Sequence, residues 1–194
     1  MPLTTSLYIA TSLDGFIARP DGAIDWLMEA QATVPPGEDC GYAEFMATVD
    51  VLVMGRHTYE QVAGFEPWPY SGKRVVVLTS RALDLKQGPG IQLEQSSESP
   101  AALLQRLDTE GCRHAYVDGG RVIQSFLSAG LIDQLTVTTV PILIGSGRPL
   151  FGELPQDVRL TLTDSKAYDF GFVQSRYSVQ ARATQGQGTN RSMA

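Results

Sequence analysis

The feature of this sequence that most constrains its fold is a pair of glycine turns built in the same way. In Val51–Thr58 and again in Ala115–Val122, a short apolar run stops at glycine and the chain restarts with an arginine on a helix-like pattern. Such a pattern predicts a buried strand followed directly by a helix. The first N–H groups of a helix attract anions, and glycine lets a phosphate approach the backbone closely. Two such turns at the same end of one sheet are suited to hold the two ends of a dinucleotide, which points to a cofactor that carries the chemistry.

Strand and helix patterns alternate along most of the chain. We expect strands over 3–11, 51–54, 74–80, 91–93 and 114–117, and helices over 24–32, 42–49, 56–62, 99–108 and 121–129. The last part changes character, because 134–140, 160–167 and 172–180 have strand patterns with no helix between them. This order predicts an α/β fold with a mainly parallel sheet and an antiparallel C-terminal edge. We expect a single domain over residues 1–181 and a polar, mobile tail over 182–194.

Composition and charge exclude several classes of protein. The 194 residues are 43% hydrophobic and 19% charged, with a formal net charge of −6, as in ordinary globular domains. A nucleic-acid binder needs a basic face, which this acidic chain does not supply. No apolar stretch approaches the roughly twenty residues of a membrane span, and the start lacks the segments of a signal peptide, so we expect a cytoplasmic protein. The two cysteines and two histidines show no metal-ligand spacing, and we expect reduced thiols and no metal site.

Six segments, in the same order along the chain, resemble a known enzyme family. Residues 53–60, 72–80 and 119–127 are similar to the core of the dihydrofolate reductase superfamily. Residues 12–18, 130–135 and 141–151 resemble the branch related to the C-terminal reductase domain of bacterial riboflavin-biosynthesis deaminase-reductases. The resemblance runs from about Leu3 to Val179. It implies a dihydrofolate-reductase-like, doubly wound sheet with helices on both faces, NADPH as the hydride donor, and a homodimer.

The resemblance also implies which residues bind the cofactor. The first glycine turn would meet the phosphates of NADPH, a turn after the third strand would lie near the adenosine 2′-phosphate, and the second glycine turn would cradle the pyrophosphate. These residues are, in that order, Gly55, Arg56, His57 and Thr58; Thr79, Ser80 and Arg81; and Gly119, Gly120, Arg121 and Val122. The physical chemistry agrees, because helix N-termini suit a pyrophosphate while arginine and hydroxyl groups suit a phosphomonoester.

Hydride transfer from a nicotinamide needs no protein nucleophile, only a positioned acceptor and a source of one proton. We expect the proton to come from water or from one of two catalytic candidates, Asp14 and Asp118. By the resemblance Asp14 lies in the loop that flanks the nicotinamide, and Asp118 stands where the riboflavin enzymes carry a glutamate. Asp118 also ends a buried strand, where an unpaired charge is costly. Arg19 is the candidate for holding a ribose phosphate, and Asp25 is a faint counterpart of the acid that binds the pterin in dihydrofolate reductases.

The sequence therefore predicts an NADPH-dependent reductase that acts on a small heterocyclic or carbonyl-type substrate. Two enzyme alternatives share the substrates of the relatives: a 5-amino-6-(5-phosphoribosylamino)uracil reductase of riboflavin synthesis, and a pterin or dihydrofolate reductase. A third alternative is a non-catalytic nucleotide-binding module on the same fold, because fold does not imply function. Hydride transfer to some acceptor separates the enzymes from the module.

Overall fold

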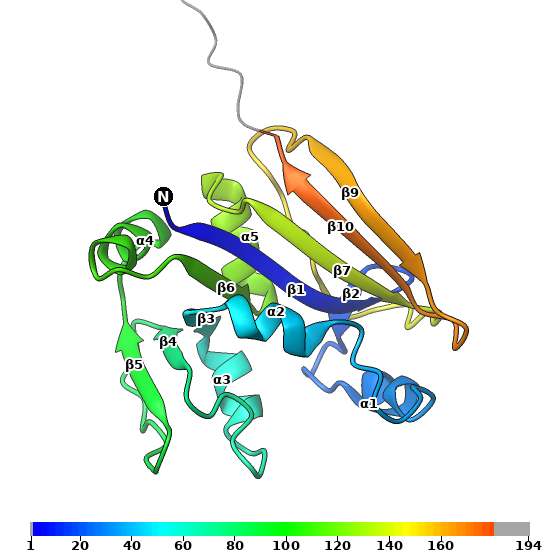
Figure 1. The fold of residues 1–194 in the computed structure, drawn as a ribbon, viewed down its shortest axis with the longest axis horizontal. Coiled ribbons are helices and arrows are strands. Elements are labelled where there is room, and N and C mark those ends of the chain that lie inside the picture. The colour runs from blue at the N-terminus through cyan, green and yellow to red at the C-terminus, as the bar shows by residue number, and fades with distance from the viewer. Residues whose placement is uncertain (1, 181–194) are drawn as a thin grey trace, which may run out of the picture.

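The computed structural model describes residues 2–180 and is built around one eight-stranded sheet (Figure 1). The strands of this sheet are β1 (Thr4–Ser12), β3 (Val51–Gly55), β4 (Arg74–Leu78), β5 (Gln92–Ser96), β6 (His114–Asp118), β7 (Gln134–Val140), β9 (Leu160–Ala167) and β10 (Val173–Val179). The helices are α1 (Asp25–Gln31), α2 (Tyr42–Thr48), α3 (Arg56–Val62), α4 (Pro100–Thr109) and α5 (Gly120–Ala129). Two further short strands, β2 (Phe16–Ala18) and β8 (Arg148–Pro149), pair with each other outside the main sheet.

The strands of the main sheet lie in the order β5-β4-β3-β6-β1-β7-β10-β9. All neighbours from β5 to β7 are parallel, whereas β10 runs antiparallel to both β7 and β9. The predicted parallel sheet with an antiparallel C-terminal edge is therefore confirmed. The sequence patterns do not predict β2 and β8, because strands of three and two residues are too short to show a period.

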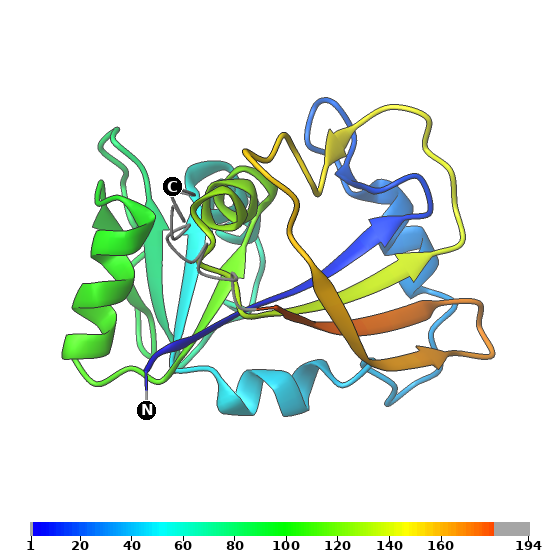
Figure 2. The same cartoon turned by 90° about the horizontal axis from the view of Figure 1, so that it is seen from above.

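Helices cover both faces of the parallel part of the sheet, as the resemblance implies. Val51 and Val53 of β3 pack in the core that includes residues of α4 and α5. Leu52 and Met54 pack on the other face, in the core that includes residues of α3 and, at its margin, α2. Figure 2 shows α5 and α2 on opposite sides of the sheet. Since side chains alternate along a strand, burial on both faces explains why β3 is an unbroken apolar run.

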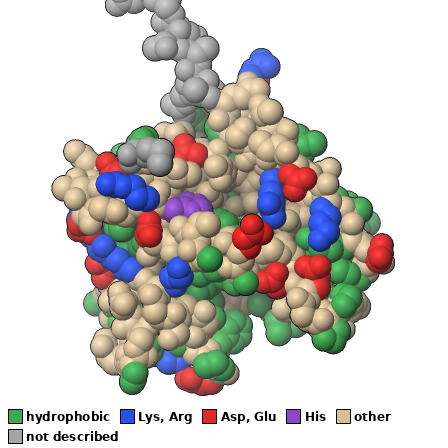
Figure 3. Space-filling view, in the orientation of Figure 1, with side chains coloured by type: hydrophobic (Ala, Val, Ile, Leu, Met, Phe, Trp, Pro, Cys, Tyr) green, Lys and Arg blue, Asp and Glu red, His purple; other side chains and the backbone are tan. Residues whose placement is uncertain are grey.

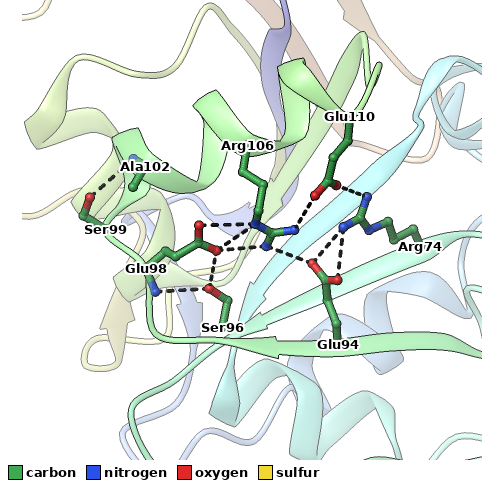
Figure 4. Close-up of polar contacts among 8 residues, drawn as sticks. All are labelled: Arg74, Glu94, Ser96, Glu98, Ser99, Ala102, Arg106 and Glu110. Carbon is green, nitrogen blue, oxygen red and sulfur yellow. Dashed lines mark hydrogen bonds and ion pairs between the residues drawn. The ribbon is translucent and has the colours of Figure 1, made fainter.

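A network of five charged side chains ties α4 to the outer edge of the sheet (Figure 4). Arg106 of α4 lies 3.0, 2.9 and 3.1 Å from carboxylate oxygens of Glu94, Glu98 and Glu110. Arg74 of β4 lies 3.0 and 2.6 Å from Glu94 and Glu110. These arginines hold the pKa of Glu98 and of Glu110 below the usual range of a glutamate. The network joins elements of the fold, so both arginines are occupied by carboxylates of the chain itself.

The surface drawn in Figure 3 carries acidic and basic side chains interspersed with one another. Within residues 2–180, no helix has the length and the apolar character needed to cross a membrane. The predicted polar tail over 182–194 lies outside the residues that the structure describes.

The central strands β1 and β6 separate toward their carboxyl ends. They pair only over Thr4–Ser6 of β1, opposite His114–Tyr116 of β6. Beyond that point β1 continues beside β7 as far as Ser12, while β6 continues beside β3 as far as Asp118. Ligands of open α/β sheets bind in the crevice outside the carboxyl ends of strands, at the place where the strand order reverses. The separation of β1 from β6 is such a place, and we call it the fork.

Candidate cofactor and substrate site

The structure brings the two glycine turns together at one edge of the sheet. Met54 and Asp118, which precede the two turns, are partners in the register of β3 and β6. A methyl group added at Gly119 would overlap the hydroxyl oxygen of Thr58, and one added at Gly55 would lie 3.1 Å from Cγ2 of Val122. The prediction that both turns lie at the same end of one sheet is therefore confirmed.

Gly119 holds the sharper of the two turns. Its φ of +88° and ψ of 134° lie in a region that essentially only glycine adopts. Gly119 is also the N-cap of α5 and provides no side-chain acceptor to the start of that helix. The first N–H groups of α5 therefore lack both an intrahelical acceptor and a capping side chain. The turn therefore offers the free N–H groups at the start of α5 to a ligand. A side chain at Gly119 would fill the space beside Thr58.

A flap formed by β2, β8 and the loops that lead into them covers this second turn. A methyl group added at Gly120 would lie 2.9 Å from Cδ1 of Ile17 and 3.5 Å from the carbonyl oxygen of Pro149. The N–H of Leu150 donates to the carbonyl oxygen of Gly15 at 3.0 Å, which joins the two halves of the flap. The loop that the resemblance places beside the nicotinamide thus lies directly against the second glycine turn.

The cationic residues predicted to bind the cofactor differ in their surroundings. Arg56 forms an ion pair with Glu60 at 2.6 Å, and Nδ1 of His57 lies 3.3 Å from the same carboxylate. Arg81 and Arg121 are exposed, and among residues 2–180 no carboxylate lies within ion-pair distance of either. Arg81 and Arg121 are therefore available to an external anion, whereas Arg56 already shares its Nε–H with Glu60.

The turn of Thr79, Ser80 and Arg81 follows β4 directly, on the same edge of the sheet as the glycine turns. The N–H of Thr79 donates to the carbonyl oxygen of Ser96 at 2.8 Å, and its hydroxyl accepts the N–H of Arg81 at 3.1 Å. Ser80 and Arg81 project from this turn as exposed residues. The backbone of the turn is fixed, while its hydroxyl and guanidinium groups face solvent.

Asp118 is the last residue of β6 and lies at the fork. One of its carboxylate oxygens accepts the N–H of Gly119 at 2.8 Å, and among the described residues it has no cationic partner. Burial of the carboxyl raises the pKa of Asp118 to about 6, although the Gly119 N–H acts in the opposite direction. A group with a pKa near neutrality can hold or release a proton during a reaction. The geometry is compatible with the catalytic role predicted for Asp118, which remains a prediction.

Asp14 has a different environment. Its carboxylate accepts hydrogen bonds from the hydroxyl of Ser12 at 2.6 Å and from the N–H groups of Gly145 and Ile144 at 2.8 and 3.3 Å. These donors hold the pKa of Asp14 below its usual range, the Ser12 hydroxyl having the largest effect. A proton donor needs a pKa near the working pH. The contacts of Asp14 are those of an anchor between two loops, and its catalytic role stays a prediction.

Arg19, the candidate for a ribose phosphate, makes a two-pronged contact with Asp25 at 2.6 and 2.8 Å. Its role toward a phosphate stays a prediction. The sequence did not single out Tyr42 or Tyr70. Tyr70 packs in the apolar cluster that includes Tyr116, and Tyr42 packs at the margin of that cluster.

No group of three or more histidine, cysteine, aspartate or glutamate side chains able to hold a metal ion occurs among residues 2–180. The thiols of Cys40 and Cys112 are both free.

Comparisons with known proteins agree with this fold. The model of the RibD C-terminal domain family matches residues 5–174. Protein YwjB of Bacillus subtilis (strain 168) is 38% identical over 171 residues, which cover 87% of this chain and 94% of that protein. Dihydrofolate reductase HdrB of Haloferax volcanii is 31% identical over 127 residues, which cover 64% of this chain and 61% of that protein.

Among solved structures, a riboflavin-biosynthesis-like protein from Shewanella sp. PV-4 superimposes with a TM-score of 0.85. It is 36% identical, and the match covers 92% of this chain and 100% of that one. Together with the family match over nearly the whole described chain, this shows that the protein belongs to the RibD C-terminal domain family, whose reductase domains share the fold of dihydrofolate reductase.

Proposed function

We propose that this protein is an NADPH-dependent reductase that transfers hydride to a small heterocyclic or carbonyl-type substrate. Membership in a family of reductase domains supports an oxidoreductase. The observation that carries the proposal is the meeting of the two glycine turns beside the fork, where Gly119 leaves space that any side chain would fill. A backbone cradle next to unpaired arginines fits a cofactor that carries several phosphates.

The residues present fit each part of NADPH. The backbone of Gly119, Gly120, Arg121 and Val122 would hold the pyrophosphate, with Gly55, Arg56, His57 and Thr58 beside it. Thr79, Ser80 and Arg81 would hold the 2′-phosphate, since hydroxyl donors and an unpaired guanidinium suit a phosphomonoester. This last group is what favours NADPH over NADH. When bound, the cofactor supplies the hydride.

The chain itself contributes position and a proton. The fork between β1 and β6 would place the substrate beside Asp118, whose carboxyl, with a pKa raised to about 6, would exchange a proton with it. The flap over Gly120 would exclude water from the same place, because Ile17 and the Pro149 carbonyl already contact the second turn.

A substrate that carries a ribose phosphate is the less favoured choice. Arg19, the cation considered for that phosphate, is held by Asp25 in a bidentate contact. The similarity to dihydrofolate reductase HdrB makes a pterin reductase the second candidate. Turnover measured with a ribosylaminopyrimidine phosphate and with a pterin would decide between these two substrates.

We also propose that the protein forms a homodimer through the exposed face of β9 and β10. Every residue of β9 is exposed. Leu160, Leu162 and Val173 are 38%, 55% and 44% exposed, and the register places them on the same face of the two strands. Exposed apolar residues grouped on an edge strand are typical of an interaction site. Sedimentation of the wild type and of Leu162→Glu tests this: a dimer that becomes a monomer supports it, and a monomeric wild type contradicts it.

Thermal unfolding with NADPH and with NADH tests the cofactor assignment. A ligand at about one hundred times its Kd that binds only the folded state adds about 2.7 kcal/mol. In a protein of this size that raises the Tm by about 5–10 °C. We expect a clear shift with NADPH and a smaller one with NADH. Arg81→Gln should reduce the NADPH shift and leave the NADH shift unchanged, and absence of any shift with either nucleotide would contradict the proposal.

A further inference from the structure

The segment that follows β4, residues 79–86, is held in place by side chains from two neighbouring elements. It forms neither a helix nor a strand, and it begins with the turn of Thr79, Ser80 and Arg81. None of its residues is buried, so water could satisfy its backbone N–H and C=O groups. Connecting segments of this kind are ordinarily the more mobile parts of a fold. The side chains that fix this one therefore need a reason other than burial.

Gln95 of β5 holds the first part of the segment by both ends of its side-chain amide. Its Nε2–H donates to the carbonyl oxygen of Arg81 at 3.0 Å, and its Oε1 accepts the N–H of Leu83 at 3.0 Å. Only one orientation of the amide places a donor opposite the carbonyl and an acceptor opposite the N–H. The carbonyl oxygen of Ser96, the next residue of β5, accepts the N–H of Thr79 at 2.8 Å. Thus β5 continues to bind the chain after its ladder with β4 has ended.

Tyr59 of α3 holds the second part of the segment with its hydroxyl. This hydroxyl donates to the carbonyl oxygen of Asp84 at 3.2 Å and accepts the N–H of Lys86 at 2.7 Å. Tyr59 is only 4% exposed, and it directly follows Thr58 of the first glycine turn. The helix that starts at the first glycine turn is therefore bound to this segment as well.

The contacts of Gln95 fix the backbone on both sides of an exposed turn. Ordering a glutamine side chain loses rotamer freedom, and what the fold gains is a guanidinium that starts from a fixed point, which lowers the ordering cost when an anion binds. We propose that Gln95 is a specificity-determining positioning residue, which presents Arg81 to the 2′-phosphate of NADPH and so favours NADPH over NADH. This inference rests on the proposed function and adds the residue that sets its cofactor preference. Tyr59 fixes the same segment relative to the first glycine turn.

The test is a fluorescence titration of wild type and Gln95→Met with NADPH and, separately, with NADH. Methionine keeps the length of the glutamine side chain and makes neither of its two hydrogen bonds. We expect Gln95→Met to weaken NADPH binding by about three- to tenfold, the effect of having to order the turn on binding, and to change NADH binding by less than about twofold. Gln92→Met is the matched control, an exposed glutamine at the start of the same strand, and it should change neither affinity.

Two further measurements separate a positioning role from a general loss of structure. In an Arg81→Gln background, Gln95→Met should cause no further loss of NADPH affinity, because Gln95 acts through Arg81. Hydrogen exchange of the Leu83 N–H should be faster in Gln95→Met, while the N–H of Thr79, which donates to the backbone of β5, stays protected. Equal losses of NADPH and NADH affinity, or a full loss in the Arg81→Gln background, would overturn the inference.

The titrations also distinguish this inference from the proposed function. A wild type that binds neither nucleotide contradicts both. A wild type that prefers NADPH, together with a Gln95→Met variant that keeps the whole of that preference, supports the proposed function and overturns only the inference.

Discussion

Replacing Asp118 by asparagine should stabilise the folded protein at neutral and alkaline pH. Burial raises the pKa of Asp118 from 3.8 to about 6, so the ionised carboxylate is less favourable in the folded state than in the unfolded chain. A difference of one unit between the folded-state and unfolded-state pKa corresponds to about 1.4 kcal/mol. For Asp118 the difference lowers the free energy of unfolding by about 3 kcal/mol above pH 7. Asparagine keeps an oxygen for the Gly119 N–H and carries no charge.

The sign of the pH dependence follows from the raised pKa. In the wild type, the buried carboxylate of Asp118 lowers the free energy of unfolding by its full amount above the folded-state pKa. This loss of stability shrinks as the pH falls through about 6 and vanishes below the unfolded-state pKa near 4. Thermal unfolding from pH 4 to pH 8 measures this change in stability. Asp118→Asn should raise the Tm at pH 8 by about 6–12 °C and leave it nearly unchanged at pH 4.

A control variant separates burial from net charge. Asp169→Asn removes the same charge from an exposed position between β9 and β10, and we expect it to change the Tm little at any pH. A loss of stability in Asp118→Asn at pH 8, or the same gain in Tm at pH 4 and at pH 8, would refute burial of the charge as the cause. The same variant should lower turnover if Asp118 holds the proton of the reaction, which would show stability traded for function.

Three further predictions concern the turns and the surface. Gly119→Ala forces alanine into a conformation that strongly favours glycine, at about 1–3 kcal/mol, and against the Thr58 hydroxyl; it should lower the Tm and abolish the NADPH shift. Gly120→Ala meets the flexible end of Ile17 and lies at ordinary contact distance from the Pro149 carbonyl, so it should lower the Tm less. Equal losses of Tm in the two variants would contradict a special role for Gly119. Arg106→Gln should lower the Tm at neutral pH and low salt, with the loss shrinking in about 1 M salt and as the paired glutamates protonate in acid; a loss independent of both would show that packing, and not charge, is responsible. Asp14→Asn should speed amide hydrogen exchange in both halves of the flap while the rest of the sheet stays protected, and unchanged exchange there would exclude Asp14 as the anchor.

Much of the fold could be read from the sequence because its signals are local. The unbroken apolar run of β3 predicts burial on both faces, and a glycine followed by an arginine at helical spacing predicts the start of α3. Gln134–Val140 is predicted as a strand with the bounds that the structure shows. The second glycine turn was found for the same reason, since a φ of +88° at Gly119 strongly favours glycine whatever lies around it.

The contacts of individual side chains were decided only by the tertiary structure. Nothing near Asp14 in sequence shows that Gly145, 131 residues away, donates to its carboxylate. Nor does the sequence show that Arg19, a candidate for a ribose phosphate, forms an ion pair with Asp25. Met54 and Asp118, which precede the two glycine turns, are neighbours because β6 returns to the middle of the sheet, between β3 and β1. Periodicity and turn chemistry act within a few residues, so the sequence determines which elements form. The order in which strands join a sheet depends on the packing of the whole chain, and that order determines which polar groups share a site.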